Sequence, residues 1–505
     1  MKKRYLVFIL AILLSSFVGY RVGVSKERAS LRTMFSIFAR VLNEIQRYYV
    51  EEKDPVELVE KGIEGMVNSL DPFSEFLTPE ESEEWSIATT GEFGGIGIQI
   101  GIRDNWLTVI APIDGTPAYR AGLRAGDRII EIEGESTKGM KIREAVKRLR
   151  GTPGTKVIIK IQRPGLDKPF EVTLIRAIIH IKSVPFYTLL EDNIGYIRLS
   201  TFQADAEAEV RAALDSLANM GAEKFILDLR GNPGGLLSEA VRISGLFLGQ
   251  GKLVVSTRSR IVEMNMEYYT QKDSPYKNNP VVILVDRGSA SASEIVSGAI
   301  QDWDRGVIVG DTTFGKGSVQ RIFKLDEGYE LKLTTAKYYT PSGRCIHKEQ
   351  KKEADSVGVS QKIVEKAYTK ILHREVYGGG GIAPDIHAKS PQTPEIVARL
   401  YPYFFTFAVE YHAAHPKYAG INEKIIQEFA SFLKRKEIKF SMEDFNKAHD
   451  FIKLYLDAEL QEKYHGMEAR YKTVLDQDKV MKKAIEIMKN LDDIKTTRKF
   501  LEDLK

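Results

Sequence analysis

Apolar runs alternate with amphipathic stretches through the middle of the chain, between residues 180 and 345. Five short apolar runs have the length of buried strands, at 194–199, 224–229, 281–286, 306–310 and 331–338. Between them, at 204–220, 238–248 and 293–303, apolar residues recur at the three- and four-residue steps of a helix. Alternating strands and helices predict an α/β layer fold with an active site at the strand ends.

Both flanks of the chain show helical patterns. Between residues 30 and 88, apolar side chains follow helical steps, for example at Phe35, Phe38, Leu42, Ile45 and Tyr49. This segment is expected to form an arm that either covers the core or joins a second copy of the chain. Residues 390–505 repeat helical steps in a background rich in Lys, Glu and Asp, which predicts a helical C-terminal domain or a partner-binding arm.

The segment 281–320 places one serine and one lysine where a hydrolase could use them. Ser291 lies in the small-residue turn SASAS between an apolar strand and a helix, and Lys316 follows 25 positions later in FGKG. A serine hydroxyl needs a base, and lysine can serve when an apolar pocket lowers its pKa from about 10.4 to roughly 7–8. Ala292, at the helix start, has a free N–H that could help to hold an oxyanion. Alone, each feature is more often an N-cap or a solvated loop lysine.

Residues 90–178 carry a different pattern, rich in short strands. GGIGIQI opens a strand after a glycine turn, and TPAYRAGLRAGDRIIEIEG follows it. Together these blocks resemble PDZ domains. The resemblance implies that N–H groups of the glycine turn bind the C-terminal carboxylate of a peptide, which adds as a strand with its apolar side chain in a pocket. The residues expected to form this site are Gly95, Ile96, Gly97, Ile98, Val146 and Leu149.

Several blocks of the core, in their order, resemble the carboxy-terminal processing proteases, also called tail-specific proteases. These blocks are LDLRGNPGG, SASASEI, FGKGSVQ and LKLTTAKYYTPSGR. The resemblance implies a ClpP/crotonase-like core with Ser291 as nucleophile and Lys316 as general base. It also implies that Gln320 orients the lysine, and that further oxyanion donors come from Gly234 and Gly235.

Asp302 matches an acidic position found in some members of this family. It lies eleven residues after Ser291, so on a helix it returns to nearly the same face. We expect either acidic support for the catalytic pair or a purely structural cap or ion pair.

Length, charge and cysteine content exclude several classes of function. The 505 residues allow three or more domains, and a net charge of +4 is nearly neutral, which argues against nucleic-acid binding. The single cysteine, Cys345, excludes an intramolecular disulfide and a cysteine-based metal cluster. The chemistry expected of the serine and the lysine needs no metal and no other cofactor.

The N-terminus has the pattern of an export signal. Lys2, Lys3 and Arg4 precede an apolar run from residue 5 to 20. Residues 1–25 are expected to be either a signal peptide that is removed or an anchor that stays in the membrane. This predicts an exported bacterial envelope protein, in the periplasm or on the periplasmic face of the inner membrane.

Taken together, the patterns predict a multidomain α/β protein whose segments have distinct roles. These segments are 1–25 (signal or anchor), 30–88 (helical arm), 90–178 (PDZ domain), 180–389 (protease core, with a charged insertion at 349–375) and 390–505 (helical C-terminal domain). The predicted function is that of a serine endopeptidase that binds apolar C-termini of proteins and cleaves through an acyl-enzyme. An oligomer formed through the helical arms and a regulatory partner are compatible with this function. The alternatives are an inactive PDZ adaptor and a crotonase-like acyl-transfer enzyme.

Overall fold

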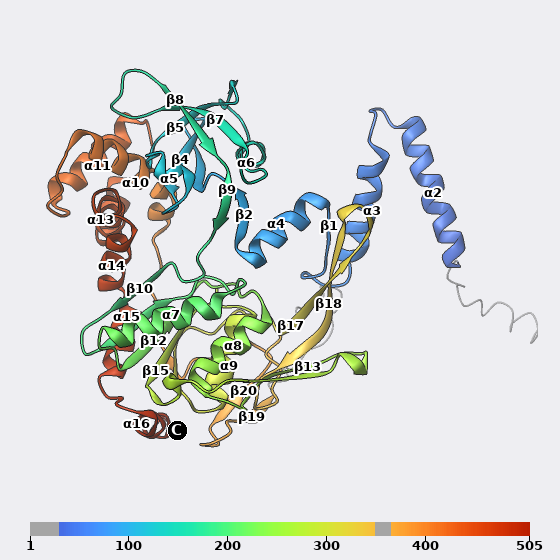
Figure 1. Cartoon of the computed structure of the whole chain (residues 1–505), viewed down its shortest axis with the longest axis vertical. Coiled ribbons are helices and arrows are strands. Elements are labelled where there is room, and N and C mark those ends of the chain that lie inside the picture. Colours follow the sequence, from blue (N-terminus) through green and yellow to red (C-terminus); the bar gives the residue numbers. More distant parts are fainter. Residues whose placement is uncertain (1–29, 349–364, 505) are drawn as a thin grey trace, which may run out of the picture. The chain divides into compact units, whose positions relative to one another are not determined.

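The computed structural model describes residues 30–348 and 365–504 (Figure 1). The predicted export segment and most of the predicted insertion lie outside the described residues. The chain divides into two compact units, residues 1–76 and residues 77–505. Among the described helices, none combines the length and the apolar character needed to cross a membrane.

The first unit contains two helices, α2 (Leu31–Tyr48) and α3 (Pro55–Asn68). Each begins at a residue that accepts a hydrogen bond from the first turn, Ser30 for α2 and Asp54 for α3. No residue of α2 is buried, although the helix is strongly amphipathic. Its exposed apolar side chains include Leu31, Phe35, Phe38 and Val41. A short strand, β1 (Glu75–Leu77), falls at the boundary of the two units in the sequence.

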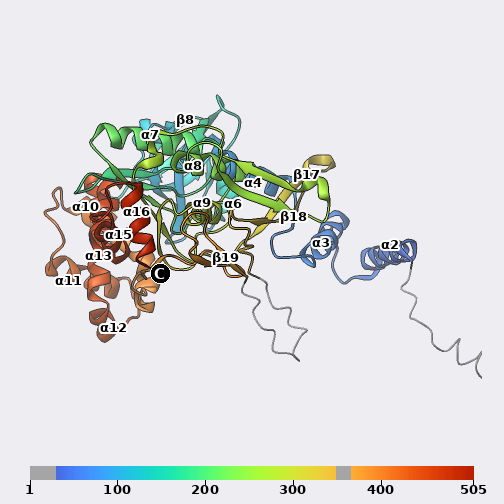
Figure 2. The ribbon, with the colours of Figure 1, turned by 90° about the horizontal axis from the view of Figure 1, so that it is seen from below.

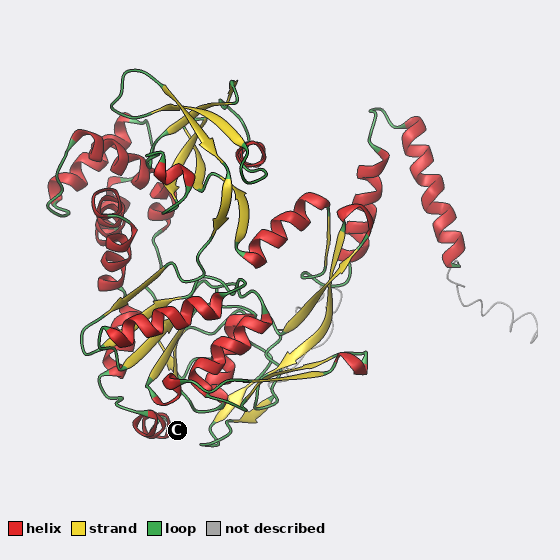
Figure 3. Ribbon diagram, in the orientation of Figure 1, coloured by secondary structure: helices red, strands yellow, loops and turns green. Residues whose placement is uncertain are grey.

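The second unit is built on a six-stranded sheet with the order β10-β11-β12-β15-β16-β21 (Figure 3). β10 pairs antiparallel with β11, and the other neighbours are parallel. The central strands are almost wholly apolar, as expected for parallel strands that are covered on both faces. The strands are β10 (Phe186–Leu189), β11 (Ile194–Arg198), β12 (Lys224–Asp228), β15 (Val281–Val285), β16 (Val307–Gly310) and β21 (Ile386–His387).

Helices cover both faces of this sheet. On one face Ile197, Leu227 and Ile283 pack with α7 (Ala206–Asn219), α8 (Leu237–Leu248) and α9 (Ala292–Asp302). On the other face the alternate residues Tyr196, Ile226 and Val282 pack with side chains from the last three helices. These are α14 (Met467–Gln477), α15 (Lys479–Met488) and α16 (Ile494–Glu502). The last three helices therefore form a layer on the central sheet, whereas the sequence predicted a helical C-terminal domain or a partner-binding arm over the whole range 390–505.

Four further helices form a core of their own. Aromatic residues dominate it, including Phe404, Phe407, Phe429 and Phe432. The helices are α10 (Glu395–Ala414), α11 (Glu423–Arg435), α12 (Met442–Lys447) and α13 (His449–His465), drawn in orange to red in Figures 1 and 2. These four helices lie within residues 390–505, the range for which the sequence predicted a helical C-terminal domain or a partner-binding arm.

The PDZ region has an independent hydrophobic core and a sheet with the order β3-β4-β5-β7-β8. β3 is an edge strand, and the short β6 pairs with β5. The entering strand β2 (Glu92–Gly95) pairs with the leaving strand β9 (Ala177–His180), and α4 (Pro79–Thr90) precedes β2. The other elements are β3 (Ile98–Arg103), β4 (Trp106–Pro112), α5 (Pro117–Arg120), β5 (Arg128–Ile132), β6 (Glu135–Ser136), α6 (Ile142–Leu149), β7 (Lys156–Gln162) and β8 (Phe170–Ile175).

A second sheet contains a long hairpin, β17 (Ser318–Lys324) with β18 (Glu330–Tyr339). β18 also pairs with β13 (Leu253–Arg258), which pairs with β14 (Met266–Tyr269). A separate small hairpin joins β19 (Lys366–Tyr368) to β20 (Glu375–Tyr377).

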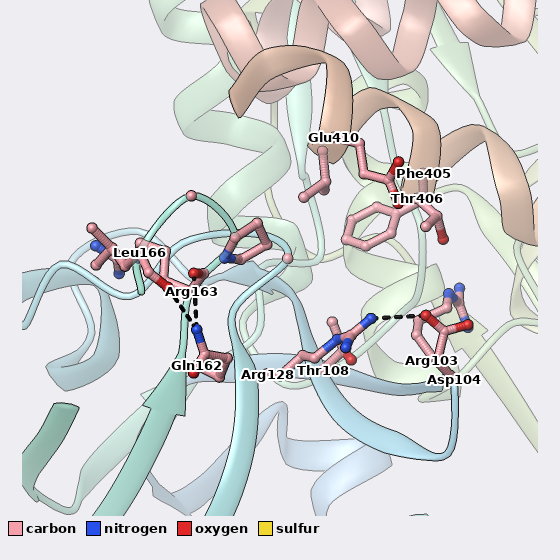
Figure 4. A pocket seen from close by; sticks show the side chains of 14 residues that line it. Arg103, Asp104, Thr108, Arg128, Gln162, Arg163, Leu166, Phe405, Thr406 and Glu410 are labelled. Carbon is pink, nitrogen blue, oxygen red and sulfur yellow. Dashed lines mark hydrogen bonds and ion pairs between the residues drawn. The ribbon is translucent and has the colours of Figure 1, made fainter. Parts of the chain in front are cut away.

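Helix α10 contacts the PDZ sheet, and a cavity of about 260 Å³ lies between them (Figure 4). The Arg103 guanidinium lies over the Phe405 ring, 5.8 Å from its centre. Gly126 touches Val409 so closely that a side chain at Gly126 would overlap it. None of the residues predicted to be catalytic lines this cavity.

Candidate functional site

The turn between β15 and α9 holds Ser291 in a conformation that L-amino acids rarely adopt. Its φ is 54° and its ψ is −111°, which costs on the order of 1–3 kcal/mol in a residue with a side chain. Such strain persists only where the surroundings hold the backbone in place. Here every residue of α9 is buried, so the helix provides a fixed support for the serine.

Hydrogen bonds distinguish Ser291 from the other two serines of the turn. The Ser289 hydroxyl donates to Leu229 O at 2.8 Å, and the Ser293 hydroxyl donates to Asn232 O at 2.9 Å. Both of these serines are completely buried, whereas Ser291 is partly exposed. Of the three, Ser291 is therefore the serine that a substrate can reach.

The Glu294 carboxylate joins the serine turn to the lysine loop (residues 313–317). One oxygen accepts hydrogen bonds from the N–H groups of Ser291 and Lys316, at 2.8 and 2.9 Å. The other accepts from the Gly315 N–H at 2.8 Å and the Thr313 hydroxyl at 2.6 Å. Because one oxygen accepts both N–H groups, the backbone nitrogens of Ser291 and Lys316 lie less than two hydrogen-bond lengths apart. Burial raises the pKa of the Glu294 carboxyl, although the four hydrogen bonds favour its charged form.

The sequence analysis missed Glu294, although a signal for it was present. A glutamate three residues after a serine that begins a helix is the pattern of a capping box. The bond from the Ser291 N–H to Glu294 is half of that motif. The pattern is local, so it could not show that the same carboxylate also reaches Gly315 and Lys316.

Tyr338, near the end of β18, makes a second bridge. Its buried hydroxyl lies within hydrogen-bonding distance of two carbonyl oxygens, Ser291 O at 3.1 Å and Lys316 O. Burial raises the pKa of this hydroxyl well above its usual value, so it remains a donor. Nucleophile and base candidates are thus connected through both their N–H and their C=O groups.

Two more segments hold the lysine loop. Thr313 N–H donates to Ile382 O at 3.1 Å, and the Ile382 N–H donates back to Thr313 Oγ1 at 2.7 Å. Lys348 N–H donates to Gly315 O at 2.9 Å. The backbone that leads to Lys316 is therefore fixed, as is needed for a base that must stay at a set distance from its nucleophile.

The glycine loop after β12 lies against the serine. A Cβ added to Gly234 would be 2.8 Å from Ser291 Cβ and 2.9 Å from Ala292 N, so the close approach requires glycine. The Gly234 N–H already donates to Asn232 Oδ1 at 2.9 Å, which corrects its expected role as an oxyanion donor. Within the described residues the N–H groups of Gly235 and Ala292 have no acceptor, and they remain the candidate donors.

Gln320 lies four residues after Lys316, beside a bulge in β17. Its amide nitrogen donates to the hydroxyls of Ser318 and Thr334, at 3.0 and 3.1 Å. These bonds fix the orientation of the amide. The side-chain oxygen of Gln320 is therefore the atom that could accept a hydrogen bond from a lysine amine.

Asp302 has structural partners. One carboxylate oxygen accepts from Arg344 Nη2 at 2.8 Å, and the other accepts from Ser342 N–H, also at 2.8 Å. Both partners belong to the segment that follows β18. The sequence analysis left two roles open for Asp302, acidic support of the catalytic pair or a structural cap or ion pair. The bonds to Arg344 and Ser342 favour the structural role.

In the PDZ domain, two backbone hydrogen bonds hold the carbonyl groups of the glycine turn. Ala118 N–H donates to Ile96 O at 2.9 Å, and Ile113 N–H donates to Gly97 O at 3.0 Å. The C=O and N–H of one peptide unit point in opposite directions. The N–H groups of Gly97 and Ile98 therefore point away from these donors, toward the free edge of β3.

The side chains expected to line the peptide pocket divide into two sets. Ile98 and Val146 are partly exposed and remain candidates for the pocket wall. Ile96 and Leu149 are only 2% and 4% exposed and belong to the domain core. The Gly151 N–H, just after α6, donates to the carbonyl oxygen of Gly94 at 3.1 Å and so joins the helix to the glycine turn.

Comparisons with known proteins add to this geometry. The profile of Peptidase family S41 matches residues 193–359, and that of the PDZ domain matches residues 108–163. A carboxy-terminal-processing protease of Bartonella bacilliformis is 38% identical over 353 residues, which cover 68% of this chain and 80% of that protein. The chain belongs to peptidase family S41.

Other similar proteins cover comparable shares of the chain. The carboxy-terminal processing protease CtpA of Bacillus subtilis is 34% identical over 355 residues, covering 69% of this chain and 75% of that protein. The solved photosystem II D1 C-terminal processing protease is 26% identical and covers 71% of this chain and 93% of its own, with a TM-score of 0.37. Membership of S41 confirms the multidomain α/β protein with a PDZ domain and the serine peptidase predicted from the sequence. It speaks against the inactive adaptor.

Proposed function

We propose that Ser291 and Lys316 form the Ser/Lys dyad of this S41 peptidase, and that the PDZ domain selects substrates by their C-termini. Ser291 Oγ attacks the scissile carbonyl carbon while the neutral Lys316 amine takes the hydroxyl proton. The C–N bond then breaks, Lys316 gives the proton to the leaving amine, and an acyl-enzyme remains. Water attacks this ester, Lys316 accepts the water proton, and the proton returns to Ser291 as the acid product leaves.

Three groups would assist the dyad. The negative charge on the attacked carbonyl oxygen would be held by the N–H groups of Ala292 and Gly235. The amide oxygen of Gln320 would accept a hydrogen bond from the Lys316 amine and set its direction. No step requires a metal or another cofactor.

The observation that carries this proposal is the Glu294 carboxylate. This buried carboxylate accepts hydrogen bonds from the backbone N–H groups of both Ser291 and Lys316. It therefore holds these two residues close together, as a catalytic pair requires. The exposure of Ser291 between two serines with buried, bonded hydroxyls supports the same assignment.

The test is cleavage of an unfolded protein in the presence of EDTA. Ser291→Ala and Lys316→Ala should each lower kcat by at least about 1,000-fold, because either change removes a reacting group. Ser293→Ala is the matched control: it removes a buried hydroxyl from the same turn and should keep kcat within about tenfold. Cleavage that survives in Ser291→Ala, or that is lost equally in Ser293→Ala, would contradict the dyad.

Substrate selection is the second part of the proposal. The relatives are named for carboxy-terminal processing, and the outward N–H groups of Gly97 and Ile98 are suited to a free carboxylate. A substrate with an apolar C-terminus should lose about tenfold or more in kcat/KM when that terminus is amidated. Val146→Asp should cause a similar loss for the free-acid substrate. Ile175→Asp, an exposed change on β8 at the opposite edge of the PDZ sheet, should not.

Two further proposals concern the N-terminal part of the chain. The exposed apolar stripe of α2 suits contact with a second copy, so Phe35→Asp should lower the oligomeric state measured by sedimentation. The basic and apolar pattern of residues 2–20 suits export, either as a removed signal or as a retained anchor. The N-terminal sequence of protein recovered from cell envelopes distinguishes the two.

A further inference from the structure

Arg230, two residues after the end of β12, has acidic partners on two sides. Its Nε and Nη2 donate to Asp228 at 3.0 and 2.7 Å, and its Nη1 pairs with Asp478 Oδ2 at 2.6 Å. The Asp228 side chain is completely buried and also accepts from the Tyr196 hydroxyl at 2.8 Å. The Arg230 and Asp478 side chains are each 13% exposed, so water screens their pair weakly.

Asp478 divides two tasks between its two carboxylate oxygens. Oδ1 accepts hydrogen bonds from the N–H groups of Val480 and Met481, at 2.9 and 3.1 Å, and so caps the N-terminus of α15. Oδ2 faces Arg230. The cap needs an acceptor oxygen, whereas the contact with the guanidinium also needs the negative charge. The two tasks can therefore be separated by substitution.

Arg230 begins the glycine loop that ends at Gly235. The next residue in the loop, Gly231, donates its N–H to Asp286 Oδ1 at 2.8 Å, and Asp286 lies at the start of the turn that carries Ser291. The start of the loop is thus held between the central sheet and the C-terminal helices. Asp478 lies far beyond residues 193–359, the part of the chain that matches the family profile.

We infer that Asp478 is a positioning residue for the peptidase reaction. Through Arg230 it keeps the glycine loop in the place from which Gly235 donates to the oxyanion. Without the charge of Asp478, one edge of a poorly solvated guanidinium loses its partner, and Arg230 must turn toward water or toward Asp228 alone. The inference rests on the proposed role of the glycine loop, and Asp478 touches neither substrate nor Ser291.

Two substitutions separate the charge from the cap. Asp478→Asn keeps an oxygen for the cap but turns an amide toward Arg230, and we expect kcat to fall about tenfold with KM unchanged. Asp478→Glu keeps the charge but is a poorer cap, and we expect kcat within about threefold of wild type together with a lower Tm. Binding of a peptide aldehyde, whose adduct with Ser291 carries the oxyanion, should weaken about tenfold in Asp478→Asn only.

Asp493→Asn is the matched control because Asp493 caps α16 through the Thr496 N–H. Within the described residues Asp493 forms no salt bridge, and its substitution should leave kcat and aldehyde binding unchanged. Equal kcat in Asp478→Asn and Asp493→Asn would overturn the inference. An equal loss of kcat in Asp478→Asn and Asp478→Glu would also overturn it. Because Asp478→Glu keeps the charge, such a loss would be due to the weaker helix cap. Cleavage by Ser291→Ala would instead contradict the dyad, whatever the Asp478 variants do.

Discussion

Glu294 and Tyr338 are the two side chains that contact backbone groups of both Ser291 and Lys316 through hydrogen bonds described above. Both are buried, and their contacts with Ser291 and Lys316 are to main-chain atoms rather than to the Ser291 hydroxyl. We therefore expect them to act on the separation of the proposed nucleophile and base, to which reaction rates are sensitive on a scale of about 1 Å.

Tyr338→Phe should lower kcat about tenfold, since two carbonyl oxygens lose a shared donor and the loops that carry Ser291 and Lys316 can separate. Loss of the buried hydroxyl should also cost about 1–2 kcal/mol of folding free energy. Tyr418→Phe removes a hydroxyl that donates to Asp457 within the C-terminal helices and serves as the control. Steady-state kinetics and urea unfolding test this, and similar kcat values in the two variants would contradict it.

Asp228 should control part of the stability in acid. Burial alone raises the pKa of its carboxyl, but Arg230 and Arg198 outweigh burial and lower the pKa from 3.8 to about 2. A carboxyl whose pKa is lowered by folding stabilises the fold above its unfolded pKa, and that contribution is lost as the pH falls toward the folded pKa. The difference corresponds to about 2 kcal/mol, lost between about pH 4 and pH 2.

Urea unfolding at a series of pH values measures this contribution. The wild-type free energy of unfolding should fall by about 2 kcal/mol more than that of Asp228→Asn between pH 4.5 and 2. The variant should be less stable at pH 7, because Arg198 and Arg230, whose side chains are partly buried, lose their shared anion. A variant with the same acid slope as wild type would contradict the assignment.

At the scale of elements, the turn into α9 depends on a strained backbone. Ser291→Gly should be more stable than Ser291→Ala by about 1 kcal/mol, because glycine adopts φ of 54° without the steric cost that alanine bears. Both variants lack the hydroxyl of the proposed nucleophile, so differences in activity do not complicate the comparison. Thermal unfolding gives the result, and a higher Tm for Ser291→Ala would show that the turn relaxes.

Local patterns predicted the elements of the core closely. The expected strands at 194–199 and 224–229 correspond to β11 (Ile194–Arg198) and β12 (Lys224–Asp228), and the expected helix at 293–303 corresponds to α9 (Ala292–Asp302). These elements have their signal in consecutive residues, since apolar runs and helical spacing need no knowledge of distant partners.

Long-range contacts explain what the sequence did not reveal. Helical spacing shows that a face of α15 is apolar, but not that the face packs on Ile226 and Val282. A glycine pair suggests a close approach, but not that Asn232 takes the N–H of Gly234. The bond from Lys316 to Glu294 likewise joins residues 22 positions apart in different elements.

At the scale of the whole molecule, the C-terminal helices connect regions that are distant in sequence. Helix α10 contacts the PDZ sheet at Gly126 and Arg103, whereas α15 contacts the central sheet. Lys224 also pairs with Asp492, at 3.1 Å. This part of the chain therefore contacts both the PDZ domain and the central sheet.

The contact between Gly126 and Val409 can be tested with paired glycine variants. Gly126→Ala and Gly122→Ala both place alanine at positive φ, 90° and 74°, but only the first meets another side chain, that of Val409. We expect losses of about 1 kcal/mol for Gly122→Ala and about 2–4 kcal/mol for Gly126→Ala.

Adding Val409→Ala should recover part of the stability in the Gly126→Ala background and none in the Gly122→Ala background. Thermal unfolding of the four variants measures the coupling. If the two glycine variants lose the same free energy of unfolding, α10 and the PDZ sheet can move apart without a loss of stability.

The last three helices also set an order of events during synthesis. After His387 of β21 the ribosome must add about 90 residues before Lys479 of α15 is made, which takes about 5 to 20 seconds. For most of that interval none of the three helices that cover Ile226 and Val282 has been made. A nascent chain therefore holds both residues of its proposed dyad before α15 is present to cover the second face of the central sheet.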